Sequence, residues 1–66
     1  MTLYRFILNR GEQTTSLTTR DLAEAEEWEH GYRTRESWDS VTAEGDPDGD
    51  EYTLTFTSTL TFTRKG

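Results

Sequence analysis

The clearest pattern in the chain is an alternation of apolar and polar positions over residues 52–63. A period of two is typical of a strand with one buried face, and it predicts a strand over the whole segment. At about 3.3 Å per residue this strand would be roughly 40 Å long. A strand of that length would extend past its neighbours, bend near Ser58 or pair with a second copy. The inward positions are Tyr52, Leu54, Phe56, Ser58, Leu60 and Phe62, and Thr53, Thr55, Thr57, Thr59, Thr61 and Thr63 lie between them.

Two segments near the N-terminus also predict strands. Residues 3–8 form a short run of aromatic and branched side chains, which suits a strand covered on one or both faces. Residues 9–12 carry turn chemistry, including Gly11. Residues 13–18 are rich in threonine, with Leu17 as the one apolar residue, and so predict a returning edge strand.

A further strand is predicted over residues 36–44, where the apolar pattern is irregular. Trp38 and Val41 stand three positions apart among polar residues. Residues on one face of a regular strand are separated by an even number of positions. This spacing therefore predicts a bulge or a strand that is only partly buried.

Between the strands predicted over residues 13–18 and 36–44, apolar residues recur at steps of three and four positions. This spacing predicts a helix with one apolar stripe. Thr18 or Thr19 is the expected cap, with Asp21 in the first turn. Gly31 is expected to end the helix in a left-handed conformation. Glu29 is an exception to the division into an apolar and a charged face, because in helical projection it lies beside the apolar stripe. The stripe consists of Leu22, Ala25, Trp28 and Tyr32.

These elements predict a small two-layer α+β domain, an antiparallel sheet of three to four strands packed by one helix. The whole chain, residues 1–66, is short enough to be one domain, and nothing resembling a linker divides it. The core is expected to depend on aromatic side chains, since eight of the few hydrophobic residues are aromatic. Monomer and homodimer both remain open.

The charge of the chain restricts its partners. Thirteen acidic residues stand against seven basic ones, for a net charge of −6. This balance opposes direct binding to nucleic acid and favours a basic protein partner. The N-terminal residues lack the apolar core expected of a signal peptide, and no apolar stretch approaches the length of a membrane span, so a soluble cytoplasmic protein is expected. The absence of cysteine excludes disulfides and thiolate metal sites.

The acidic residues are concentrated in two stretches, one on the predicted helix and one in a turn. Glu24 and Glu27 face solvent in projection, and several acids stand three residues apart, where like charges cost a few tenths of a kcal/mol. One interpretation is a row of carboxylates that binds basic residues of a partner and imitates a phosphate backbone. The other is a solvated face that promotes solubility. The predicted partner-binding residues are Asp21, Glu24, Glu26, Glu27, Glu29, Asp46, Asp48, Asp50 and Glu51.

The acidic turn has a superficial likeness to a calcium loop, because Asp46, Asp48 and Asp50 alternate. The match fails at the sixth and twelfth positions, where Glu51 and Thr57 replace the required glycine and glutamate. A structural turn built on proline and glycine is the preferred interpretation. No metal or other cofactor is therefore predicted.

An enzyme is not predicted. His30 is the one histidine, no nucleophile is placed beside it, and a domain of this size has little room for a substrate cleft.

The acidic helix over residues 21–29, the acidic turn over residues 46–51 and the threonine-alternating strand, behind a Met-Thr-Leu-Tyr-Arg-Phe start, resemble a small phage-encoded anti-CRISPR protein. The resemblance is to inhibitors of type I systems, such as type I-C. It covers the whole chain in size, charge and order of elements, without a diagnostic motif. It implies binding to a basic surface of the CRISPR surveillance complex or its nuclease, which blocks access to target DNA in the host cytoplasm.

The alternative is a salt-adapted protein-interaction module with an unknown partner. One lysine, six arginines, thirteen threonines and many acids are also typical of proteins adapted to high salt. In that case the charge serves solubility alone.

Overall fold

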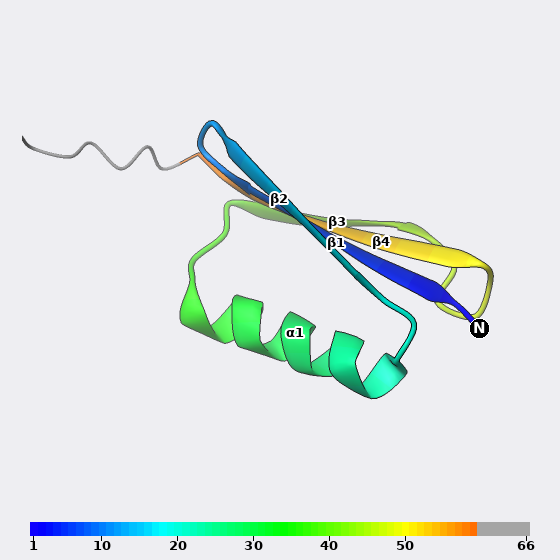
Figure 1. Ribbon diagram of the computed structural model, residues 1–66. Helices are drawn as coiled ribbons and strands as arrows, with labels where there is room; N and C mark the ends of the chain where they lie inside the picture. Colours follow the sequence, from blue (N-terminus) through cyan, green and yellow to red (C-terminus); the bar gives the residue numbers. More distant parts are fainter. Residues whose placement is uncertain (60–66) are drawn as a thin grey trace, which may run out of the picture.

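The computed structural model describes residues 1–59 as one sheet covered on one face by one helix (Figure 1). This arrangement confirms the predicted two-layer α+β class. Positions 60–63 of the strand predicted at the C-terminal end lie outside the described residues. The elements are β1 (Leu3–Arg10), β2 (Gln13–Thr19), α1 (Leu22–Arg35), β3 (Ser40–Gly45) and β4 (Glu51–Ser58).

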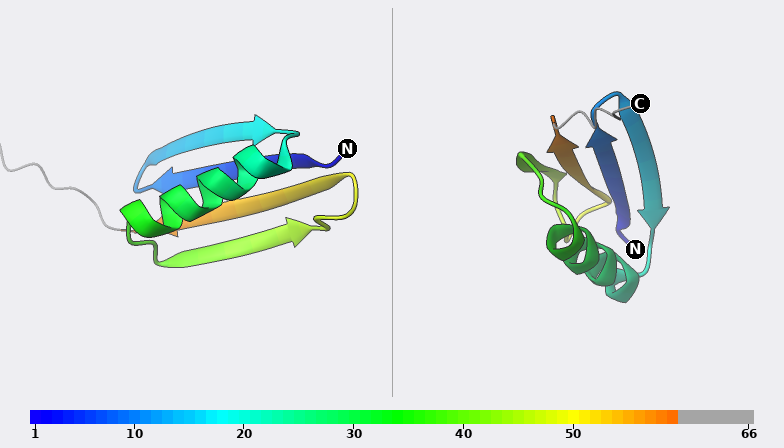
Figure 2. Two further views of the ribbon diagram at one scale, coloured as in Figure 1. Left: turned by 90° about the horizontal axis from the view of Figure 1, so that it is seen from below. Right: turned by 90° about the vertical axis from the view of Figure 1, so that its left-hand side faces the viewer.

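The sheet is mixed, with strand order β2-β1-β4-β3. The hairpins β1–β2 and β3–β4 are antiparallel, whereas the central pair β1–β4 is parallel, which corrects the expectation of a wholly antiparallel sheet. The helix is the cause. It carries the chain back along the sheet, so that β3 starts at the same end as β2 (Figure 2). Strand β3 therefore runs in the same direction as β2, and β4, the inner strand of the second hairpin, runs parallel to β1.

The core lies between the central strands and the helix. Tyr4, Phe6 and Leu8 on β1 are buried beside Leu54 and Phe56 on β4, in a register that pairs Phe6 with Leu54 and Leu8 with Phe56. The Phe6 and Phe56 rings are stacked with centroids 6.1 Å apart. Aromatic rings thus supply most of the buried volume, as the composition predicts.

The predicted alternation is confirmed along β4, which ends at Ser58, so that Thr59 lies outside the strand. Leu54 and Phe56 point to the helix, and Thr53, Thr55 and Thr57 lie on the other face of the sheet. Within residues 1–59 no helix or strand covers that face (Figure 2). Its polar side chains suit a face left open to water.

The helix begins two or three residues later than predicted, because Asp21 and not Thr18 or Thr19 is the N-cap. The Asp21 carboxylate accepts a hydrogen bond of 3.0 Å from the backbone N–H of Ala23. Thr19 assists, since its hydroxyl accepts from the Asp21 backbone N–H at 3.1 Å and donates to Glu24 at 2.6 Å. The threonine, the aspartate and the glutamate together satisfy polar groups at the start of the helix.

The prediction that Gly31 ends the helix in a left-handed conformation is wrong. The helix continues to Arg35, and the backbone N–H of Glu36 donates to the Tyr32 carbonyl at 3.3 Å. Gly31 has no positive φ. A Cβ atom at this position would lie 2.9 Å from the Arg35 guanidinium, so the glycine leaves space for that side chain.

Trp38 explains the irregular spacing in the third predicted strand. It precedes β3, its ring lies 5.3 Å from the Phe56 ring, and its indole N–H donates to the Tyr32 carbonyl at 2.9 Å. The pairing of β3 with β4 runs without interruption from Ser40 to Gly45. Of the two predicted alternatives, the bulge is absent, because the tryptophan belongs to the connection and not to the strand. The partly buried strand is confirmed, since Val41 is half-buried and the other residues of β3 are exposed.

Candidate partner-binding surface

The two acidic stretches lie at the same end of the molecule. Strand β1 starts at this end, β2 finishes there, and the helix begins directly afterwards. The turn over residues 46–50 lies beside the start of β1, because the backbone N–H of Leu3 donates to the Asp50 carbonyl at 2.8 Å. Figure 1 shows the start of α1 and the β3–β4 turn at the same side of the fold as the N-terminus. The topology thus gathers carboxylates that the sequence separates by some twenty positions.

The acidic turn is held by its own hydrogen bonds. The Asp46 carbonyl accepts from the Gly49 backbone N–H at 2.8 Å, and the Asp46 carboxylate accepts from the Asp48 N–H at 2.9 Å. The Thr2 hydroxyl lies 2.7 Å from the Gly49 carbonyl and 3.2 Å from that of Pro47. The predicted structural turn is confirmed, and the N-terminus fixes its position.

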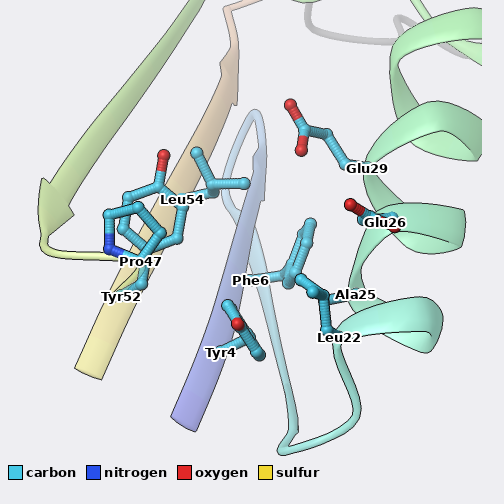
Figure 3. A pocket seen from close by; sticks show the side chains of 9 residues that line it. All are labelled: Tyr4, Phe6, Leu22, Ala25, Glu26, Glu29, Pro47, Tyr52 and Leu54. Atoms are coloured by element: carbon cyan, nitrogen blue, oxygen red, sulfur yellow. The ribbon is translucent and has the colours of Figure 1, made fainter. Parts of the chain in front are cut away.

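A pocket of about 230 Å³ opens between the helix and the sheet at this acidic end (Figure 3). Its floor is made by Tyr4 and Phe6 of β1 with Tyr52 and Leu54 of β4. The Tyr4 and Tyr52 rings meet edge to face with centroids 6.5 Å apart. The floor is therefore largely aromatic and apolar, with two phenol groups.

The mouth of the pocket combines an apolar side chain with two carboxylates. Leu22, Glu26 and Glu29 approach from the helix, and Pro47 approaches from the turn. Figure 3 shows the Glu29 carboxylate extending from α1 over the space between helix and sheet. The prediction that Leu22 packs into the core is wrong. It is 53% exposed, because the first turn of the helix stands away from the sheet and the pocket occupies the space.

Glu29 carries out two tasks at this site. Its side chain is 39% exposed and forms an i, i+4 ion pair with Arg33, at 3.0 Å. Because Glu29 lies beside the apolar stripe of the helix, it also lines the pocket. Glu26 and His30, also four residues apart on the helix, form no ion pair within residues 1–59.

The remaining predicted residues are placed differently. Asp21 and Glu24 stabilise the start of the helix, and Glu27 is exposed on the helix surface. Glu51 lies on the open face of the sheet, with its carboxylate 3.5 Å from Arg5. The structure thus brings Glu26 and Glu29 together with the turn, and it directs Glu51 away from the pocket.

Basic residues gather at the opposite end of the fold. Arg10 ends β1, and Arg33 and Arg35 lie in the last turn of the helix. Arg10 binds Glu36 through two hydrogen bonds of 2.9 and 2.6 Å. This contact raises the pKa of Arg10 and lowers the pKa of Glu36. Carboxylates therefore predominate at the end where the helix begins, although Arg20 donates to the Met1 carbonyl there at 3.2 Å, and Arg10 and Arg33 are paired with glutamates at the other end.

Within the described part of the chain, no group of three or more histidine, aspartate or glutamate side chains is arranged to hold a metal ion. In the same part, no helix has the length and apolar character needed to cross a membrane.

Sequence reasoning missed the floor of the pocket. Tyr4 and Tyr52 have the spacing of ordinary core residues, and Pro47 that of an ordinary turn residue. The one available signal was Glu29, a carboxylate on the apolar side of the helix.

No family model, curated protein or solved structure matches this chain.

Proposed function

We propose that this protein is a stoichiometric inhibitor that binds the basic DNA-binding surface of a type I CRISPR surveillance complex or of its nuclease. It would act as a DNA mimic of the anti-CRISPR kind, without touching nucleic acid itself. Target DNA and the inhibitor would compete for the same lysine and arginine side chains.

The observation that carries the proposal is the gathering of both acidic stretches at one end of the fold. Asp46, Asp48 and Glu26 are all exposed at this end. Exposed carboxylates placed together produce a local negative potential that attracts a basic surface and raises the association rate. A protein whose charge served hydration alone would have no need to concentrate it in this way.

Competition with DNA tests the proposal directly. Purified surveillance complex is mixed with fluorescently labelled target DNA, and DNA binding is followed by anisotropy as the protein is added. We expect loss of DNA binding at equimolar protein, and weaker inhibition at higher salt because screening reduces the attraction. The same titration with the isolated nuclease identifies which of the two proteins is bound.

Two variants with the same change in charge provide the control. Asp48→Lys alters the acidic turn, whereas Glu12→Lys alters the β1–β2 turn at the opposite end, and both side chains are exposed. We expect Asp48→Lys to weaken inhibition about tenfold and Glu12→Lys to leave it nearly unchanged. Equal inhibition by the two variants would contradict a site at the acidic end. Failure of the wild-type protein to displace DNA from either target would leave the salt-adapted module as the better description.

A further inference from the structure

The chain twice places an arginine between a carboxylate and an aromatic ring. The Arg10 guanidinium binds Glu36 and lies 5.6 Å from the centre of the Trp38 ring. Arg33 binds Glu29 at 3.0 Å and lies 5.7 Å from the centre of the Phe56 ring. The guanidinium suits such places because it is planar, donates several hydrogen bonds and stacks on aromatic faces.

The pocket at the acidic end repeats these surroundings without an arginine. Glu26 and Glu29 supply carboxylates at its mouth, and Tyr4 and Tyr52 supply rings in its floor. None of the described residues that line it is basic. We infer that this pocket receives an arginine side chain from a protein partner.

The size of the pocket favours a single side chain. Its volume of about 230 Å³ is below the roughly 300–1,000 Å³ of pockets that hold drug-sized ligands. An arginine side chain joins an apolar stem to a charged head, and its stem would cover Leu22, which is 53% exposed at the mouth.

Charge distribution explains how the head is held. Glu29 already binds Arg33 through one oxygen, Oε2. A carboxylate has two oxygens and about four acceptor positions, so it can accept from a second guanidinium. Glu26 forms no ion pair within residues 1–59 and is exposed, so it is the principal acceptor for the incoming side chain.

This inference rests on the proposed function for the source of the arginine, which would be the basic surface of the inhibited protein. Arginine is a frequent anchor of protein interfaces, where it fills a pocket on the partner. The pocket would then set the position of the inhibitor, while the surrounding carboxylates provide long-range attraction.

Titration of the isotope-labelled full chain with a small peptide tests the site. The probe is acetyl-Gly-Arg-Gly-amide, followed by two-dimensional ¹H–¹⁵N NMR. We expect saturable shifts of the backbone amides of Ala25, Glu26 and Tyr52, with millimolar affinity. The matching citrulline peptide has the same shape without the charge, and we expect it to bind at least about tenfold more weakly, since hydrogen bonds to charged groups are the stronger ones.

Neighbouring glutamates give a matched pair of variants. Glu26→Gln removes a carboxylate from the pocket, and Glu27→Gln removes the adjacent one, which is exposed and does not line the pocket. We expect arginine affinity to fall about tenfold in Glu26→Gln and less than about twofold in Glu27→Gln. The dispersion of the NMR spectrum shows that each variant is folded.

Equal losses in both variants, equal binding of the citrulline peptide, or no saturable shift at the pocket amides would overturn the arginine site. None of these results involves a CRISPR component, so the competition assay with DNA stands or fails separately. A protein that displaces DNA but does not bind the peptide would retain the proposed function and lose the pocket inference.

Discussion

At the residue scale, Gly45 is a position where any side chain would be strained. It ends β3 with a φ of 89°, a value that side chains other than glycine rarely adopt. A Cβ atom there would overlap the carbonyl oxygen of Glu51 across the hairpin. The acidic turn therefore depends on this glycine for its entry geometry.

We expect Gly45→Ala to lower the free energy of unfolding by about 2–4 kcal/mol, because backbone strain is added to a steric overlap. Urea denaturation measures the loss. Gly49→Ala is the control in the same turn, since Gly49 has no positive φ and its Cβ would lie 3.2 Å from the Asp46 side chain. We expect that variant to lose less than about 1 kcal/mol. Similar losses for the two variants would show that conformation at Gly45 is not the cause.

At the scale of the element, the helix contains a glycine, Gly31, although the backbone conformation there is one that any residue can adopt. Gly31 lies in its interior in ordinary helical conformation. Glycine weakens a helix interior relative to alanine because it loses more backbone freedom on folding. The glycine leaves room for Arg35, whose guanidinium lies near the position that a Cβ of residue 31 would occupy and 5.8 Å from the centre of the Tyr32 ring.

We expect Gly31→Ala to raise the free energy of unfolding by about 0.5–1 kcal/mol, or the melting temperature by roughly 4 °C, because the flexible arginine can move aside. Thermal unfolding followed by circular dichroism measures the gain. The same substitution in an Arg35→Ala background should give a larger gain, since the neighbour is then absent. A loss of stability in that background would contradict this account of Gly31.

At the scale of the whole molecule, Arg10 and Glu36 connect the far end of the sheet to the end of the helix. Both side chains are 35% exposed, so solvent screens part of their attraction. The hydrogen bond from Arg10 lowers the pKa of Glu36 from its ordinary value of 4.5. The stabilisation is therefore complete above that value, and it is lost as the pH falls through the lowered pKa of the folded state.

We expect Glu36→Gln to reduce the free energy of unfolding by about 0.5–1 kcal/mol at neutral pH, a value that allows for screening of a partly exposed pair. The difference between wild type and variant should shrink as the pH falls below 4.5. Urea denaturation of both proteins from pH 3 to 7 would test this expectation. A difference that is constant across this range would exclude ionisation of Glu36 as its source.

The sequence by itself determined the elements and the class of the fold. The period of two around Leu54 and Phe56, and the steps of three and four through Ala25 and Trp28, depend only on local backbone geometry. Such patterns identify the buried faces, and one helix with several strands leaves few ways to cover them. The acidic turn could also be predicted from the sequence, because Pro47 and Gly49 favour a turn locally.

Four features could not be predicted from local patterns and are seen only in the folded chain. They are the parallel central pair, the continuation of the helix through Gly31, the position of Trp38 before β3, and the pocket. Each depends on groups far apart in the chain. The direction of β4 follows from the path of the helix across the sheet. The pocket forms because the first turn of the helix stands away from the sheet. Local periodicity carries no information on either, because it specifies which face of an element is buried and not what that face meets.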